Sequence, residues 1–416
     1  MMKKRVVSCI LVLLISVTAV FAVSMRTQSQ EDHPFDSWPM IERYYNEMSD
    51  SSMDFWEGCT VSLLTVSPGA PLYSWFGHSA FLVTTPDGRE ITFDYGTFSF
   101  RDEDFFTNFA MGRLWFVCHS SYADYHYEDL DSDGRTVSRV ILPLNASQKK
   151  AVIGLLNANI KSENREYLYH HYTDNCATRL RDIIDRTTDG DFQAWAKSQS
   201  GLTFRQQASR ELSLHPFVQW ALEFLQSGRI DKQATLWDEM FQPDVLERAV
   251  KEYFGLSSEI VVDNGEHEMK QKADANILFA VAFGLMLGIL PCIFFILRKR
   301  GAGFFFTGLV DIILGILGSL LLFMMVFTDH DVTWMNENII FVNPLLLVAG
   351  ICAFIGRDGA RRFCILIHRL LAFLMVILVV LKLVLPSVFI QQNWNILITV
   401  ILFYLPVCIL PRLERD

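Results

Sequence analysis

The sequence has little charge and no excess of basic residues. Only 20% of its 416 residues are Asp, Glu, Lys or Arg, whereas soluble globular chains contain about a quarter. The formal net charge is -10, so the chain lacks the positive charge with which nucleic-acid-binding proteins neutralise phosphates. We therefore expect no nucleic acid partner, and a hydrophobic content of 51% excludes a disordered chain.

Several chemical signatures are also absent. Eight cysteines are too few for a disulfide scaffold in a chain of this length. The sequence contains no HExxH pair, no CxxC pair and no Gly-rich phosphate loop. We therefore predict neither a metal enzyme nor a bound cofactor.

What is present divides the chain into two unlike parts. Residues 273–416 hold 10 Lys and Arg against 8 Asp and Glu, whereas residues 1–272 hold 26 against 38. The first part is acidic and ordinary in composition, and the second is strongly apolar. The mean hydropathy of the whole chain is therefore an average over two regions of different composition.

The N-terminus has the pattern of a secretory signal over residues 1–22. Lys3, Lys4 and Arg5 precede an apolar run over residues 6–23, and cleavage is expected after Ala22, a residue that signal peptidase accepts. The alternative is an uncleaved anchor, since about 18 apolar residues are just enough to span a bilayer. In both cases residues 23–272 form an exported domain.

Residues 273–416 are predicted to form a transmembrane domain of five helices. The expected spans are 275–297, 303–327, 339–355, 363–385 and 395–411, each close to the ~20 residues that the hydrocarbon core requires. Lys and Arg gather in 298–300, 357–362 and 412–415, whereas 328–338 and 386–394 contain neither. By the positive-inside rule the C-terminus is cytoplasmic, which agrees with export of the first domain.

Three polar residues within the expected spans need an explanation. Asp311 lies well inside the second span, and an intramembrane carboxylate is a functional candidate by default; the alternative is a structural hydrogen bond to a neighbouring helix. Lys382 and His368 lie near opposite ends of the fourth span and are expected to extend toward the membrane interfaces.

The exported part reads as an α+β domain, with a sheet first and helices around it. Helices are expected over 147–162, with Ser147 as its cap, and from about 174 to 184, and most of the remainder to 255 is expected to be helical. The acidic run 128–133 is expected to be a solvated loop. Strand-like patterns cover 60–66, 78–84, 90–95, 114–119 and 136–142, with a turn at 86–88.

One exported thiol lies where a helix is expected to begin. Cys176 follows Asp174 and Asn175, both natural N-cap residues. In the first helical turn a thiol faces the positive end of the helix dipole, which lowers its pKa and supplies N–H groups for an oxyanion. The alternatives are a buried structural cysteine or a disulfide partner; Cys59 and Cys118 are the other exported thiols and could pair with each other.

A thiol nucleophile needs a base, and His78 is the candidate. It opens an expected strand directly after Gly77, which leaves space beside it. A structural histidine is the alternative. His170 and His171 precede the Cys176 helix and are reserve candidates for the base.

The motifs around these residues together resemble the Lnb-type family, which joins a periplasmic N-terminal domain to a helical membrane domain. The resemblance covers nearly the whole chain after the signal. It rests on Gly77-His78-Ser79-Ala80, Asp94-Tyr95-Gly96-Thr97-Phe98, Asn175-Cys176-Ala177-Thr178 with Arg179 and Asp182, Asp329-His330 with Asn336, Asn338 and Asn343-Pro344-Leu345, and Gln392-Asn393-Trp394-Asn395.

The resemblance implies a permuted papain-like fold of the NlpC type and an activity in lipoprotein maturation. The expected reaction moves an acyl chain from a membrane phospholipid, through a thioester on Cys176, to the α-amino group of a diacylglyceryl-cysteine. The expected location is a bacterial inner membrane, with residues 23–272 in the periplasm. The expected partners are the bilayer, a phospholipid donor and a diacylated lipoprotein acceptor.

A third group would orient His78. A hairpin around 86–88 places Asp94 opposite Ala80, on the strand beside His78, so Asp94 is the candidate; Asn175 and Tyr95 are the alternatives. Asn175, Thr178 and Tyr95 are also expected to support the site and its oxyanion.

Three other functions use the same features. A phospholipase or thioesterase would share the acyl-enzyme but release the acyl group to water, and a peptidoglycan amidase would use the same Cys–His pair. A non-enzymatic exported sensory domain would need neither Cys176 nor His78. Five membrane spans are more than an amidase requires, which favours a lipid substrate.

Overall fold

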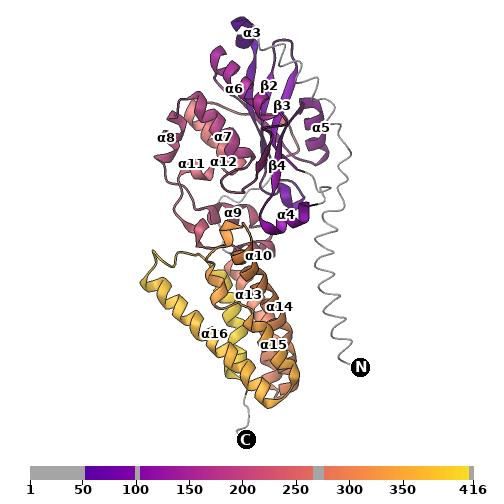
Figure 1. The fold of residues 1–416 in the computed structure, drawn as a ribbon, viewed down its shortest axis with the longest axis vertical. Coiled ribbons are helices and arrows are strands. Elements are labelled where there is room, and N and C mark those ends of the chain that lie inside the picture. The colour runs from indigo at the N-terminus through magenta and orange to yellow at the C-terminus, as the bar shows by residue number, and fades with distance from the viewer. Residues whose placement is uncertain (1–51, 99–103, 266–275, 412–416) are drawn as a thin grey trace.

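The computed structural model describes residues 52–98, 104–265 and 276–411. The signal predicted for residues 1–22 lies outside these ranges. Two bodies of different construction follow each other along the chain, a mixed α/β domain and a helical domain of apolar helices (Figure 1).

The first domain contains one antiparallel sheet in the order β6-β4-β3-β2-β1-β5-β7. The sequence pattern found the five central strands but not the short strands at the two edges. The strands are β1 (Thr60–Val66), β2 (His78–Thr84), β3 (Glu90–Thr97), β4 (Trp115–Tyr122), β5 (Val137–Ile141), β6 (Glu166–Leu168) and β7 (Glu259–Val262).

Helices cover both faces of this sheet, with α5 on one side and α6, α7 and α12 on the other (Figure 1). Side chains alternate along a strand, so Val61 and Leu63 of β1 pack toward α6, α7 and α12, whereas Leu64 and Val66 pack toward α5. The helices are α3 (Met53–Gly58), α4 (Phe105–Met111), α5 (Ala123–Ser132), α6 (Ala146–Asn159), α7 (Cys176–Thr187), α8 (Asp191–Lys197), α9 (Phe204–Leu212), α10 (Pro216–Leu225), α11 (Leu236–Glu239) and α12 (Pro243–Phe254), with the 3-10 turns η2 (Leu72–Ser74) and η3 (Gly228–Asp231).

Two local predictions in this domain are wrong. The acidic run 128–133 is largely helical, because Ala123 and Leu130 bury one face of α5 against the sheet. Helix α6 is capped by Asn145, not Ser147, since Asn145 and Gln148 form a reciprocal capping box.

In the second domain, residues 276–411 contain four helical segments that are long and apolar enough to cross a membrane, and a shorter fifth helix, α17. A 16-residue helix is about 24 Å long, less than the ~30 Å of a hydrocarbon core. The helices are α13 (Ile277–Ile296), α14 (Arg300–Phe327), α15 (Leu345–Ile355), α16 (Asp358–Val384) and α17 (Trp394–Ile409), and the outer loops carry the 3-10 turns η4 (Asp331–Thr333) and η5 (Glu337–Ile340).

The polar residues of this domain are paired inside it. His368 is buried 2.9 Å from Asp311, and Lys382 is buried against Glu337 at 2.5 Å. The prediction that His368 and Lys382 extend to the interfaces is therefore wrong: each finds a carboxylate within the protein, which removes the need to reach water.

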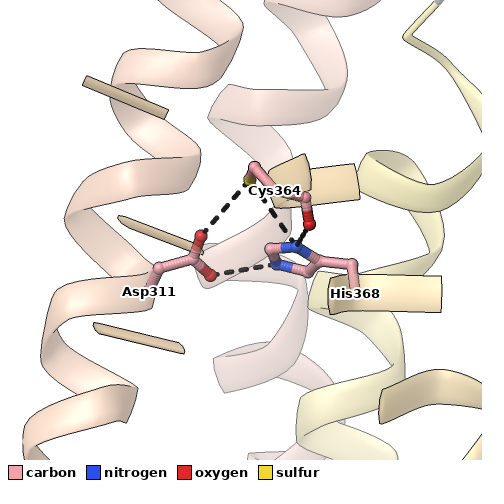
Figure 2. Close-up of side chains that lie close together, drawn as sticks. All are labelled: Asp311, Cys364 and His368. Carbon is pink, nitrogen blue, oxygen red and sulfur yellow. Dashed lines mark hydrogen bonds and ion pairs between the residues drawn. The ribbon is translucent and has the colours of Figure 1, made fainter. Parts of the chain in front are cut away.

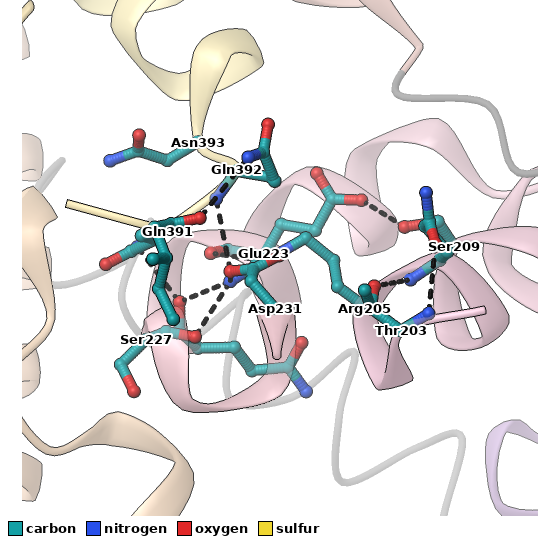
Figure 3. Close-up of polar contacts among 12 residues, drawn as sticks. Thr203, Arg205, Ser209, Glu223, Ser227, Asp231, Gln391, Gln392 and Asn393 are labelled. Atoms are coloured by element: carbon teal, nitrogen blue, oxygen red, sulfur yellow. Dashed lines mark hydrogen bonds and ion pairs between the residues drawn. The ribbon is translucent and has the colours of Figure 1, made fainter. Parts of the chain in front are cut away.

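Helices α9 and α10 join the two domains. Trp220 and Phe224 of α10 belong to the apolar core of the membrane helices. Beside them Arg205 donates to both carboxylate oxygens of the buried Asp231, at 2.7 and 3.0 Å, and the N–H of Gln392 donates to the same carboxylate (Figure 3). The outer loop before α17 is therefore bonded directly to the exported domain.

Candidate active site

Cys176 is the first residue of α7, and its position is fixed by the residue before it. Asn175 Oδ1 accepts the N–H of Thr178 at 2.9 Å, and Thr178 Oγ1 accepts the N–H of Asn175 at 2.8 Å. The Asn175 amide also donates to the carbonyls of His171 and Phe241. Of the two predicted caps, Asp174 and Asn175, the helix uses Asn175, and such a cap contributes about 1 kcal/mol to helix stability.

The same cap decides which groups near Cys176 can donate to a ligand. The N–H of Thr178 is used by Asn175, and the N–H of Arg179 donates to the Asn175 carbonyl. The N–H groups of Cys176 and Ala177 are left without an intrahelical acceptor. Asn175 and Thr178 thus hold the helix start with their side chains, and the backbone of Cys176 and Ala177 supplies donors at the positive end of the helix dipole.

His78 lies beside Asp94 on the neighbouring strand. Ala80 pairs with Asp94 in the register between β2 and β3, as the hairpin predicts. The ring nitrogen Nε2 of His78 is 2.8 Å from Asp94 Oδ1. The side chain of Cys176 is close enough to the same ring to interact with it electrostatically and to raise the pKa of His78. Because Nε2 is engaged by Asp94, Nδ1 is the nitrogen left to exchange a proton with the thiol.

The electrostatic interactions among His78, Asp94 and Cys176 favour the charged forms of His78 and Asp94. Burial favours a neutral ring, but Asp94 and Cys176 together outweigh burial and raise the pKa of His78 to about 10. Burial likewise favours a neutral carboxyl, but His78, with help from His126 and the N–H of Gly96, holds the pKa of Asp94 well below its ordinary value. An imidazolium beside a carboxylate is therefore the stable state near neutral pH.

Gly96 is a part of the site that sequence reasoning passed over. Its N–H donates to Asp94 Oδ1 at 2.5 Å. A Cβ at this position would lie 2.4 Å from His78 Cε1 and 3.1 Å from Nδ1. The ring thus packs directly on the glycine backbone. The available signal was a glycine two residues after the candidate carboxylate, within the resembling motif.

We expect Gly96→Ala to lower turnover by about 10²-fold, because a displacement of about 1 Å is enough for a loss of that size. The backbone of Gly96 is not left-handed, so the methyl group strains the ring and not the chain. Gly154→Ala, where an added Cβ meets nothing within 4 Å, is the matched control. Equal activity of the two variants in a lipid acyl-transfer assay would contradict this arrangement.

His126 is a second residue that the sequence did not single out. It lies on α5, and it is close enough for its charge to act on His78 and Asp94. Burial, and then the nearby His78, lower its pKa to about 4 in spite of Asp94, so the ring is neutral at physiological pH. Its Nε2 is buried and has no hydrogen-bond partner within residues 52–98, 104–265 and 276–411.

Tyr95 and the reserve histidines do not form part of the group. Tyr95 is buried in the core, where its hydroxyl accepts from Asn159 at 2.7 Å. His171 packs its ring against Phe76 and Phe241, and burial lowers its pKa to about 4. His170 lies 3.0 Å from Asp331 in an outer loop of the membrane domain. Tyr95 therefore does not contact His78, and its contribution to the site is limited to packing in the core of the domain.

The outer loop that contains Asp329, His330 and Asp331 packs against the exported domain near Cys176. Asp329 pairs with Arg113 at 2.6 Å, and His330 Nε2 is 3.0 Å from the carbonyl of Phe109. The Asp331–His170 pair reaches the segment that leads into α7. Phe109, whose carbonyl meets His330, has an exposed ring, and other aromatic side chains of this domain are also exposed, among them Tyr73, Phe106 and Trp115. The outer loop therefore contacts the segment that leads into Cys176.

The other exported cysteines are free thiols in the core, so the structure does not pair Cys59 with Cys118. Burial raises the pKa of Cys59 to about 11 and of Cys118 to about 12. Cys176 is only partly buried. Solvent therefore reaches the thiol of Cys176 more easily than the two thiols in the apolar core.

We expect iodoacetamide at pH 7.5 to modify Cys176 and to leave Cys59 and Cys118 untouched until the protein is denatured. A thiol of pKa about 11 is ionised in roughly one molecule in 3,000 at that pH, and only the thiolate reacts. Peptide mapping by mass spectrometry measures the three sites in one sample. Labelling of Cys59 or Cys118 at the rate of Cys176 would contradict the assignment.

Comparison with known families identifies both halves of the chain. The model of the Lnb N-terminal periplasmic domain matches residues 46–210. The model of the Lnb transmembrane domain matches residues 276–411. No curated protein and no solved structure matches the chain.

Proposed function

The chain belongs to the Lnb family, a family of membrane proteins with a periplasmic domain and several transmembrane helices, and from this premise we propose that it is a lipoprotein N-acyltransferase of the bacterial inner membrane. The donor is a membrane phospholipid. The acceptor is the free α-amino group of a diacylglyceryl-cysteine at a lipoprotein N-terminus. The observation that carries the proposal is the Cys176–His78–Asp94 arrangement, beside a docked outer loop of the membrane domain.

The first half-reaction loads the enzyme. The Cys176 thiolate attacks the carbonyl carbon of a phospholipid ester, and the N–H groups of Cys176 and Ala177 stabilise the oxyanion of the tetrahedral intermediate. The C–O bond to the glycerol breaks, and the departing alkoxide takes a proton from His78. The products are an S-acyl enzyme and a lysophospholipid.

The second half-reaction transfers the acyl chain. The lipoprotein amine attacks the thioester carbonyl, and His78 accepts the amine proton. The C–S bond breaks, an amide forms and the thiolate of Cys176 is restored. Asp94 orients the His78 ring through Nε2 and stabilises its charged form in both halves.

The order of the elements supports a permuted papain-like fold of the NlpC type. The strand that carries His78 precedes the helix that begins with Cys176, and the strands between them are antiparallel. The permutation leaves the chemistry unchanged, because a catalytic group is defined by its geometry and not by its order in the chain.

The membrane domain has a role in this proposal because both substrates are anchored in lipid. Contacts of the outer loops with the exported domain hold Cys176 near the bilayer surface. Residues 23–272 are then periplasmic and the C-terminus is cytoplasmic. An acyl chain and a lipoprotein N-terminus reach the thiol without leaving the membrane.

The experiment is mass spectrometry of lipoprotein N-termini in cells that lack other N-acyltransferases, with and without this chain. We expect triacylated N-termini only when the chain is present. The same extracts are analysed for lysophospholipid and free fatty acid. Lysophospholipid together with free fatty acid, and no triacylated N-terminus, would overturn the proposal and identify a phospholipase. If the lipoprotein N-termini, the lysophospholipid and the free fatty acid all stay unchanged, the result would favour a non-enzymatic domain.

A further inference from the structure

Three polar side chains that are not part of the candidate active site meet inside the membrane domain, and Figure 2 shows how they face one another. Asp311 comes from α14, and Cys364 and His368 lie four residues apart on one face of α16. All three are fully buried. The Sγ of Cys364 is 3.9 Å from Asp311 Oδ2, and His368 Nε2 is 2.9 Å from Asp311 Oδ1.

The tautomer of His368 follows from its second nitrogen. Nδ1 is 3.0 Å from the carbonyl oxygen of Cys364. A carbonyl oxygen can only accept, so Nδ1 carries a proton and donates it. In the neutral ring Nε2 therefore presents a lone pair, and this lone pair faces a carboxylate oxygen. Two acceptors 2.9 Å apart repel each other unless a positive charge lies between or beside them.

That charge comes either from a shared proton or from a bound metal ion. Apart from their mutual contact at 2.9 Å, Asp311 Oδ1 and His368 Nε2 have no hydrogen-bond partner among the residues that the structure describes. The ring of His368 packs edge-on against Phe403 and Tyr404, so its surroundings are apolar. In such surroundings an unsatisfied polar group is costly, and within a membrane it cannot turn to water.

We propose that Asp311, Cys364 and His368 bind a transition-metal ion of the Zn²⁺ type. A thiolate, an imidazole nitrogen and a carboxylate are the three ligand types that zinc uses in proteins. Ligand atoms of a tetrahedral zinc site lie about 3.3–3.8 Å apart, and one atom from each of these residues lies within 4.8 Å of the others.

The hydrogen bond made by the second ring nitrogen of His368 is also typical of a metal-bound histidine. Metal-bound histidines commonly donate their other ring N–H to a backbone carbonyl, which fixes the ring and raises its basicity. The contact from Nδ1 to the Cys364 carbonyl is such a bond. A metal here ties α14 to α16. Asp311 and Cys364 lie in the first halves of α14 and α16, the halves that adjoin the basic loops 298–300 and 357–362.

The first test is the metal content of the full-length chain purified in detergent and incubated with zinc sulfate. We expect about one zinc per chain, and the same in Cys292→Ser, which removes a membrane-domain thiol outside the cluster. We expect less than a tenth of that amount in Cys364→Ser and His368→Asn. Equal zinc in the native chain and in Cys364→Ser would overturn the proposal.

The second test needs no substitution in the cluster and therefore does not depend on whether a variant folds. The native chain and Cys176→Ala are loaded with Co²⁺, which reports thiolate ligation by a near-ultraviolet charge-transfer band. We expect the band in both proteins, whether or not Cys176 is needed for acyl transfer. Its absence from the native chain would show that Asp311 and His368 share only a proton, and would overturn the metal site.

Discussion

Replacement of Cys176 by alanine is expected to lower acyl transfer by at least about 10⁴-fold, because the variant cannot form the covalent acyl intermediate. The expected result is an absence of both lysophospholipid and N-acylated peptide when the purified variant is mixed with phospholipid vesicles and a diacylated lipopeptide. The fold is expected to persist. Helix α7 is capped by Asn175 and Thr178, and neither bond involves the Cys176 side chain.

The matched control for this variant is Cys59→Ala, which removes a buried thiol of raised pKa from the same domain. We expect this control to keep its turnover and to lose some stability, since it leaves a small cavity in the core. Intact protein mass spectrometry adds a direct readout, because the native enzyme given phospholipid alone is expected to gain one acyl mass. Turnover by Cys176→Ala within tenfold of the native rate would exclude a thiol mechanism.

Replacement of Asp94 by alanine is expected to lower turnover by about 10³-fold. Without the carboxylate nothing holds Nε2 of His78, and the imidazolium loses the charge that stabilises it. The reaction rate is measured with the same vesicles and lipopeptide. Asp94→Asn is the control, because an amide oxygen can still accept a hydrogen bond from Nε2 and orient the ring, so we expect a smaller loss of turnover.

The pair formed by Asp94 and His78 also predicts a pH dependence of stability. The pKa of His78 rises from 6.5 to about 10 on folding, so its contribution is complete below pH 6.5 and is lost as the pH rises toward 10. The pKa of Asp94 falls on folding from 3.8, so its contribution is lost as the pH falls below that value. The native chain should therefore exceed Asp94→Asn in stability most clearly between about pH 4 and pH 6.5.

Thermal unfolding of the native chain and of Asp94→Asn across pH 4 to 10 measures this difference. The difference in unfolding temperature between the two proteins is expected to be largest on the acidic side of neutrality and to disappear toward pH 10. A gap that widens with rising pH would contradict an imidazolium at His78. A gap that does not change with pH would assign Asp94 a role in packing alone.

Many local features of the fold could be predicted from the sequence. The alternation of His78–Thr84 and the turn at 86–88 predicted a hairpin, and the structure confirms the pairing of Ala80 with Asp94. The cap at Asn175 was predictable from the residues just before Cys176. Such features depend on turn chemistry and on periodicity over a few residues, which the sequence displays directly.

Features that depend on packing between segments distant in sequence were harder to predict. The approach of Gly96 to the His78 ring depends on the register of two strands and on the ring's rotamer. The acidic helix α5 was mistaken for a loop because Ala123 and Leu130 alone give a weak apolar pattern. Lys382 was expected at the interface, and only the folded chain brings Glu337 to it.

The sequence by itself determined the division into an acidic domain and an apolar membrane domain and the family, and it predicted the orientation in the membrane. Composition, charge in loops and short motifs are properties of the chain. Only the tertiary structure decided which side chains meet. Cys176 reaches His78, and Asp311 reaches His368, across long separations in sequence. The environment of a side chain is set by residues that folding brings from elsewhere, and no local pattern records them.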